Sequence, residues 1–148
     1  MKIVEKIEQD LFAAMKEKNS EVVRTLRMAM ASIKYAEKEK LKPLEELEVI
    51  NVLQKEIRVR QESIEEAKKG NRQDIIDENE QDIKLLEKYL PAALSEAELD
   101  ALVQKIIAET GAQTMKDMGK VMSIAVQEAQ GRAANNVISQ AVRKFLAG

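Results

Sequence analysis

The chain has 148 residues, of which 45% are hydrophobic, 34% are charged and 3% are aromatic, and its net charge is -2. This composition is ordinary for a soluble globular protein, and the small net charge excludes a global electrostatic attraction to nucleic acid. The absence of Cys and His excludes disulfides, thiolate chemistry, the usual general base near neutral pH and the commonest metal ligand.

Helical periodicity runs through the first 90 residues. The spacing of apolar residues predicts four helices, over residues 2–17, 20–40, 44–69 and 72–90. Three residues are predicted to mark their ends. Ser20 is placed to cap the second helix, Pro43 to start the third, and Gly70 to end the third in a left-handed conformation.

Three shorter helices are predicted after Pro91. Ser95 begins a capping box at the start of the fifth helix, and Gly111 ends that helix. Gly131 closes the sixth helix, and Asn135 or Asn136 is placed to cap the last one.

The scarcity of aromatic residues, Gly and Pro predicts a core of Leu, Ile, Val, Met and Ala, which is typical of helix bundles. We therefore predict an all-α fold with an N-terminal four-helix unit followed by a C-terminal three-helix unit. The predicted domain boundaries are 1–91 and 92–148. No apolar run approaches the ~18 residues of a membrane span, so we expect a cytoplasmic protein with no membrane partner.

No catalytic site is apparent in the sequence. Hydrolysis of glutamine needs an activated nucleophile, and the Ser residues have no His partner. Gly119-Lys120 lacks the remainder of a phosphate-binding loop. Carboxylate pairs such as Glu65/Glu66 are able to hold a metal, but such residues usually form a solvated helix face. We predict no catalytic residue, no metal and no cofactor.

Two groups of basic residues are candidate RNA-binding surfaces. The first lies near the C-terminus, where residues 91–110 are net acidic and residues 111–148 are net basic. Gly119 in this group either permits close approach to a backbone or allows tight helix packing. No exposed aromatic platform is evident, which favours recognition of RNA shape and phosphates over base stacking. The predicted members are Lys116, Gly119, Lys120, Arg132, Arg143 and Lys144.

The second group is a row of cations on one face of the helix predicted over residues 20–40. Four cations in a row are able to follow phosphates. The alternative is a solvated face paired with Glu37 and its neighbours at helical spacing. The row consists of Arg24, Arg27, Lys34 and Lys38.

Arg60 and Arg72 flank the predicted bend between the third and fourth helices. Because Arg suits bidentate pairing with carboxylates, we expect these two residues to pair with carboxylates such as Glu80 or Glu87. Such pairs would fix the angle between the two helices.

Several short motifs lie in order along the chain: Tyr89-Leu90-Pro91, Asp117-Met118-Gly119-Lys120-Val121-Met122 and Gly131-Arg132-Ala133. Together they closely resemble the YqeY family, also called the GatB/YqeY family, over essentially the whole chain. The resemblance implies two helical parts and a relationship to the tail of the B subunit of glutamine-dependent aminoacyl-tRNA amidotransferase, which helps to hold tRNA. Family members are often labelled as carbon–nitrogen ligases with glutamine as amido-N-donor.

The chain departs from the family pattern at two places. Ala134-Asn135 stands where many members have Asp-Gly, and Ser123 stands where Gly is common. Our leading hypothesis is an accessory module associated with tRNA or another RNA. One alternative is a helical adaptor that binds a protein partner, and the other is a non-catalytic helper of amidotransfer. The candidate partners are therefore tRNA and a protein; the sequence gives no indication of oligomeric state.

Overall fold

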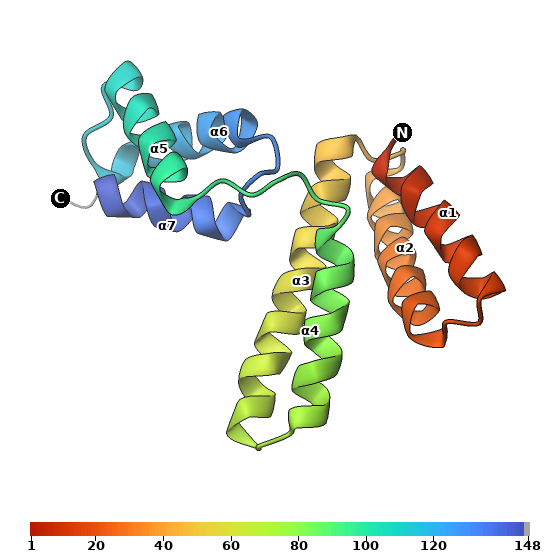
Figure 1. The fold of residues 1–148 in the computed structure, drawn as a ribbon. Helices are drawn as coiled ribbons and strands as arrows, with labels where there is room; N and C mark the ends of the chain where they lie inside the picture. Colours follow the sequence, from red (N-terminus) through yellow and green to blue (C-terminus); the bar gives the residue numbers. More distant parts are fainter. Residues whose placement is uncertain (147–148) are drawn as a thin grey trace. The chain divides into compact units, whose positions relative to one another are not determined.

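The computed structural model describes residues 1–146, which form seven α-helices and one short 3-10 helix (Figure 1). No residue in that range belongs to a β-strand, so the prediction of an all-α fold is confirmed. Residues 147–148, at the end of the predicted C-terminal domain, lie outside the described residues. Within residues 1–146, every helix is too short or too polar to cross a bilayer.

Contacts divide the chain into two compact units, Met1–Leu90 and Pro91–Gly148. The first unit contains four helices, and α3 and α4 form a long hairpin that is yellow and green in Figure 1. One apolar stripe of each helix is buried in a shared core, where Leu26, Leu53 and Leu86 have no exposed surface. The helices are α1 (Ile3–Lys16), α2 (Ser20–Lys40), α3 (Glu46–Lys69) and α4 (Gln73–Glu87).

The starts of α2 and α3 differ from the prediction. Asn19, rather than Ser20, occupies the cap position of α2, and its side-chain oxygen accepts a hydrogen bond from the backbone N–H of Val22 at 3.4 Å. Pro43 does not begin α3. Glu45 caps that helix instead, because its side chain and that of Glu48 satisfy backbone N–H groups in the first turn. The cap of α2 thus lies one residue before the predicted position, and α3 begins at Glu46, three residues after Pro43.

The end of α3 also differs from the prediction. Gly70 has φ -96, so it is not left-handed, and Asn71 takes the left-handed conformation with φ 55. The N–H of Arg72 then donates to the carbonyl of Ala67 at 2.9 Å. Asn is among the few residues that adopt this conformation readily, which explains why the turn moves by one residue.

A buried polar network connects α2, α3 and α4. The Arg60 side chain is only 6% exposed. Its guanidinium donates to the Glu56 carboxylate at 2.8 Å and lies 3.5 Å from that of Asp82. Asp82 also accepts from the Thr25 hydroxyl at 2.8 Å, and Glu56 accepts from the Ser32 hydroxyl at 2.6 Å. Each of these side chains has a partner, so the network fixes how the three helices align.

Both Arg residues pair with carboxylates, as predicted, but the partners are neither Glu80 nor Glu87. Arg60 bonds one carboxylate a turn earlier on its own helix and another across the hairpin, whereas Arg72 pairs with Asp74 at 3.0 Å at the exposed end of the hairpin. The expected structural role is therefore filled by Arg60, through different carboxylates.

The second unit contains three α-helices and the 3-10 helix. Helices α5, α6 and α7 each contribute one apolar stripe to a core that is separate from that of the first unit. Val103, Val121 and Val142 in this core have no exposed surface. In Figure 1, α7 runs back alongside α6 toward the side on which α6 begins. The elements are α5 (Glu96–Thr110), η1 (Met115–Asp117), α6 (Met118–Ala129) and α7 (Asn135–Leu146).

The predicted ends of α5 are confirmed. The Ser95 hydroxyl oxygen accepts from the N–H of Glu98 at 3.1 Å, and Gly111 is left-handed with φ 70. The start of α7 is different, because the carbonyl of Ala134 accepts the first helical bonds, from Val137 and Ile138, at 3.0 Å each. Ala134 therefore occupies the cap position, instead of Asn135 or Asn136, and its methyl group offers no oxygen to the free N–H groups.

Candidate nucleic-acid interface

Arg132 is held within the second unit. Its Nε donates to the carbonyl of Ala92 at 2.8 Å, and its guanidinium lies 3.6 Å from the carboxylate of Glu98. Its own carbonyl accepts from the N–H of Leu94 at 2.8 Å. Gly131, with φ 78, forms the left-handed turn that precedes it. Arg132 thus fastens the segment before α5 to the turn between α6 and α7.

Lys144 is also engaged within its unit. Its Nζ donates to Asp100 at 2.8 Å and lies 3.9 Å from a carboxylate oxygen of Glu96. The hydrogen bond to Asp100 is the main reason that the pKa of Lys144 is raised, and the charges of Asp100 and Glu96 add to this effect. The acidic start of α5 therefore faces two of the cations predicted to bind RNA.

Three other predicted cations remain exposed and make no ion pair with a carboxylate of residues 1–146: Lys116, Lys120 and Arg143. Lys116 lies in η1, four residues before Lys120 in the first turn of α6. Arg143 lies in the last turn of α7. Because α7 returns alongside α6 (Figure 1), these three residues lie toward the same end of the unit.

Gly119 is exposed in the first turn of α6. Apart from its chain neighbours and the backbone of its own helix, no atom lies within 4 Å of the position where a Cβ would be. The interpretation that Gly119 allows tight helix packing is thus wrong for the described part of the chain. The neighbouring Asp117 occupies the cap position of α6. Its carboxylate accepts from the N–H groups of Gln113 and Thr114 at 2.9 and 3.3 Å, and these bonds, helped by the charge of Lys120, lower its pKa.

The row of cations predicted on α2 is divided by the structure. Arg24 lies 2.5 Å from Glu78 and 3.9 Å from Asp82, both on α4, so it joins two helices. The guanidinium of Arg27 contacts the sulfur of Met15 at 3.9 Å. Arg24 is consequently part of the packing of the first unit rather than a free cation.

The remainder of this row, Lys34 and Lys38, is exposed on α2. The alternative interpretation expected these residues to pair with Glu37, but neither does. The Glu37 carboxylate instead accepts from the backbone N–H of Leu44 at 3.0 Å and closes the turn between α2 and α3. Sequence spacing placed Lys34 and Lys38 on one face of α2, but it did not predict that the Glu37 carboxylate would bond to the turn after this helix.

Two aromatic side chains are exposed, contrary to the expectation from the sequence. Phe12 is 60% exposed on α1, and Tyr35 is 67% exposed on α2. Tyr35 follows Lys34 directly, so an aromatic ring and a cation are neighbours on α2. The exposure of Tyr35 follows from helical periodicity, which places it off the buried stripe that Met30 and Ile33 occupy.

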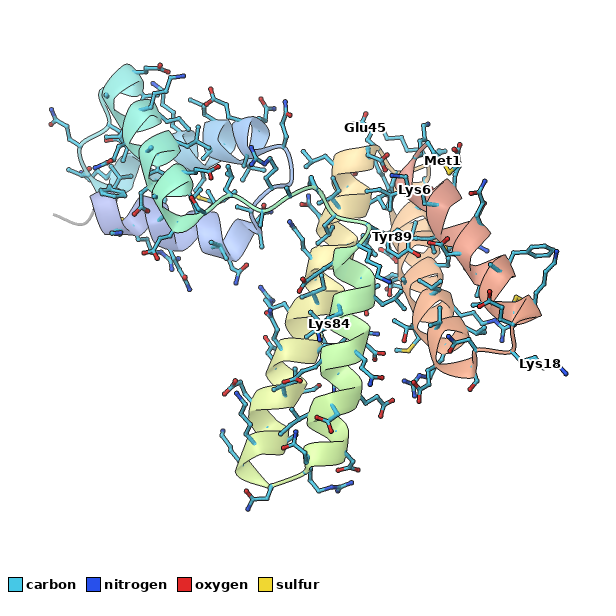
Figure 2. The ribbon with its side chains drawn as sticks, viewed as in Figure 1. Met1, Lys6, Lys18, Glu45, Lys84 and Tyr89 are labelled. Atoms are coloured by element: carbon cyan, nitrogen blue, oxygen red, sulfur yellow. The ribbon has the colours of Figure 1, made fainter. Side chains whose placement is uncertain are left out.

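Tyr89 of the Tyr89-Leu90-Pro91 motif has a structural position. It is buried just after α4, on the side of α1 and α2 (Figure 2), and its hydroxyl donates to the Asp10 carboxylate at 2.5 Å. Burial is the main cause of a raised pKa for Tyr89, followed by this hydrogen bond and the charge of Asp10. The contact ties the first helix to the end of the fourth.

The carboxylate pairs considered as metal ligands lie next to cations. Glu65 and Glu66 each have a Lys amine at 3.3 Å, from Lys68 and Lys69. In the part of the chain that the structure describes, no group of three or more Asp, Glu, Cys or His side chains is arranged to hold a metal ion.

The sequence matches one protein family and is similar to several known proteins. A family model described as "Yqey-like protein" matches residues 4–146. "Altered inheritance of mitochondria protein 41, mitochondrial" from Lachancea thermotolerans is 32% identical over 151 residues, covering 96% of this chain and 80% of that protein. The protein of the same name from Pyrenophora tritici-repentis is 26% identical, covering 90% of this chain and 75% of that protein.

Proposed function

This chain belongs to the YqeY family, and from that premise we propose that it is an RNA-associated accessory module. Its RNA-contacting region is the α6 surface, which we define as Lys116, Gly119, Lys120 and Arg143. The observation that carries the proposal is the open space above Gly119, directly beside an exposed Lys120.

The charges at the α6 surface support this proposal. Lys116, Lys120 and Arg143 form no ion pair with a carboxylate of residues 1–146, whereas Arg132 and Lys144 do. Lys120 is nevertheless close enough to Asp117 for its charge to help lower the pKa of that carboxyl group, after two backbone hydrogen bonds. The acidic residue at the start of α6 is its cap residue, Asp117, whose carboxylate already accepts from the N–H groups of Gln113 and Thr114. An anion brought by a partner would neutralise the three cations. Phosphate is suitable, because each neutralised phosphate releases counterions.

Gly119 gives the surface a shape suited to a backbone. Without a Cβ, Gly119 leaves the first turn of α6 open to close approach of a phosphate group. A folded RNA offers phosphates at fixed spacing, so the surface is suited to shape and phosphate recognition. The resemblance of the chain to the amidotransferase tail makes tRNA the first RNA to test.

The first experiment measures fluorescence anisotropy of labelled total tRNA at increasing salt. With three phosphate contacts, we expect log Kobs to fall with log salt at a slope of about -2 to -3. Lys120→Glu should weaken binding about tenfold and make the slope shallower by about one. Lys105→Glu is the matched control, because Lys105 is an exposed cation of α5 in the same unit, and it should leave binding nearly unchanged.

A second pair of variants separates binding from folding. Gly119 is helical without a left-handed φ, so Gly119→Ala should stabilise the protein by about 0.5–1 kcal/mol. The added methyl group should nevertheless weaken tRNA binding, because it stands between the helix and the phosphate. Ser123→Ala, one turn later on an exposed position of α6, should leave binding unchanged.

Equal binding by wild type, Lys120→Glu and Gly119→Ala would exclude the α6 surface, and absence of tRNA binding at low salt would overturn the proposal for this chain. Arg132→Glu is unsuitable as a binding variant, because it would break the contacts with Ala92 and Glu98. We also propose a cytoplasmic location, which a fluorescent fusion tests. The names of the fungal relatives call those proteins mitochondrial, and a mitochondrial signal would overturn this part.

A further inference from the structure

A groove of about 980 Å³ lies between the C-terminal half of α2 and the N-terminal half of α3. We call it the α2–α3 groove. Small side chains on α2 leave room for an occupant, and larger apolar side chains border that space. The residues that define it are Ala31, Ser32, Tyr35, Ala36, Leu44 and Val52.

Two large side chains on or just after α2 are exposed. Tyr35 lines the groove and is 67% exposed, whereas Leu41 follows the groove residue Lys40 without lining the groove itself, and it is 89% exposed. Leu41 also has φ 64, a left-handed conformation that disfavours side chains other than Gly or Asn. Leu41 is therefore both strained and solvated, and Tyr35 is the one of these two side chains that lines the groove itself.

The charges along the groove have an uneven distribution. Lys40 pairs with Glu48, and Glu56 is bonded by Ser32 and Arg60, so these charges are satisfied inside the protein. Glu39 and Lys55 also line the groove, and neither has an ion-pair partner among residues 1–146. They lie at opposite ends.

Contacts between the two helices fix this separation. Lys55 adjoins Glu56, whose carboxylate accepts from Ser32. Ser32 lies seven residues before Glu39 on α2, which is about 10 Å along a helix. The groove therefore has an acidic end near the α2–α3 turn and a basic end two turns away.

We propose that the α2–α3 groove binds an amphipathic helix of a partner protein. This helix lies antiparallel to α2 and parallel to α3, with its N-terminus near Glu39 and its C-terminus near Lys55. The positive N-terminal end of a helix dipole then meets the acid, and the negative end meets the base. Apolar residues at positions i, i+3, i+4 and i+7 of the partner face Tyr35 and Val52.

This proposal is independent of the RNA-binding proposal, because it uses other residues in the other unit. The test is a display selection of 14-residue peptides with helical apolar spacing and random flanking charges, against the full chain. We expect enriched peptides to have basic residues in the first turn and acidic residues in the last. The enriched peptides should bind with micromolar Kd, and Ala31→Arg should weaken them at least tenfold. Ala31 is exposed on α2, so this variant keeps the helix.

A charge exchange makes the test specific for orientation. Against Glu39→Lys/Lys55→Glu, selection should favour the opposite peptide polarity, by about fivefold over the original sequences. A reversal of preference is not produced by loss of folding, and circular dichroism of both variants verifies their helices. Lys68→Glu, on the far exposed end of α3, is the control that should leave the preference unchanged.

Three outcomes would overturn the proposal. One is that no helical peptide is enriched, or that the enriched peptides are insensitive to Ala31→Arg. Another is that sedimentation shows a dimer of the wild type that Ala31→Arg converts to a monomer, because the occupant would then be a second copy. The third is that a labelled single-stranded RNA binds and is lost in Tyr35→Ala, because the surface would then be a stacking platform.

Discussion

The basic residues near the C-terminus have the same charge but different surroundings. Arg132 and Lys144 meet the carboxylates of α5, while Lys116, Lys120 and Arg143 do not. The sequence identifies all five as cations on helices or at helix ends. It does not say which ones face an acid, because that depends on how three helices pack. The charge asymmetry is thus partly an internal contact and only partly a surface for a partner.

Ala134 is a residue whose replacement should stabilise the protein. It occupies the cap position of α7 without a side-chain oxygen, and the first turn of α7 contains no acidic residue. Ala134→Asp should add a capping hydrogen bond and a favourable dipole interaction, raising the free energy of unfolding by about 1 kcal/mol. Urea denaturation measures this change.

Ala134→Glu is the control for this substitution. It adds the same charge but has a longer side chain that is a poor helix cap, so it should stabilise the protein less. If both variants have equal stability, the effect arises from charge alone and the capping explanation is wrong.

Tyr89 should make stability depend on alkaline pH. Its raised pKa means that the folded protein retains the phenolic proton after the unfolded chain has lost it, near pH 10. The stabilisation is therefore fully present below about pH 10 and declines as the pH rises above that value. Tyr89→Phe should lower stability by about 1 kcal/mol at neutral pH and reduce its decline above pH 10.

Tyr35→Phe is the matched control, because Tyr35 is exposed and has no hydrogen bond to a carboxylate. Its stability between pH 8 and 11 should follow that of the wild type. A Tyr89→Phe variant with an unchanged alkaline profile would show that the contact with Asp10 does not influence folding.

At the scale of elements, the sequence predicts helices better than it predicts their partners. The periodicity of apolar residues gives every helix within a few residues, since it reflects the local geometry of one helix. Caps at Ser95 and Gly111 are also local and were predicted correctly. The pairing of Arg60 with Asp82 depends on the alignment of two helices in a hairpin, and no local spacing determines that alignment.

The network around Arg60 should be strongly non-additive. Arg60→Met leaves the partly buried carboxylates of Glu56 and Asp82 without their cation, so we expect a loss of about 3 kcal/mol. Adding Glu56→Gln and Asp82→Asn removes those charges and should restore part of the loss. Arg58→Met, which removes an exposed pair with Glu62, should cost less than about 0.5 kcal/mol.

Thermal denaturation of the wild type and the three variants measures this coupling. The result that contradicts the prediction is a triple variant less stable than Arg60→Met. In that case hydrogen bonding by the two carboxylates to Thr25 and Ser32 matters more than their unpaired charge.

At the scale of the whole molecule, residues 1–146 contain two hydrophobic cores that share no residue. Composition and the Pro91 seam predicted two helical domains, and independent folding of these domains remains a prediction. A compact region with its own core is in principle able to fold alone. The smaller unit has less apolar surface to bury, so we expect it to be the less stable of the two.

Separate expression of residues 1–91 and 92–148 tests this prediction. We expect each fragment to be helical by circular dichroism and to unfold cooperatively, and the sum of their spectra to match that of the full chain. If fragment 92–148 is unfolded while the full chain is folded, the second unit requires the first for its stability.

The positions of the two tyrosines have a practical consequence for such experiments. Tyr35 and Tyr89 both lie in the first unit, one exposed and one buried against Asp10, and the chain contains no Trp. Intrinsic tyrosine emission therefore observes the first unit alone, while far-ultraviolet dichroism observes the helices of both. Following the two signals together during denaturation distinguishes the unfolding of one half from that of the other without any label.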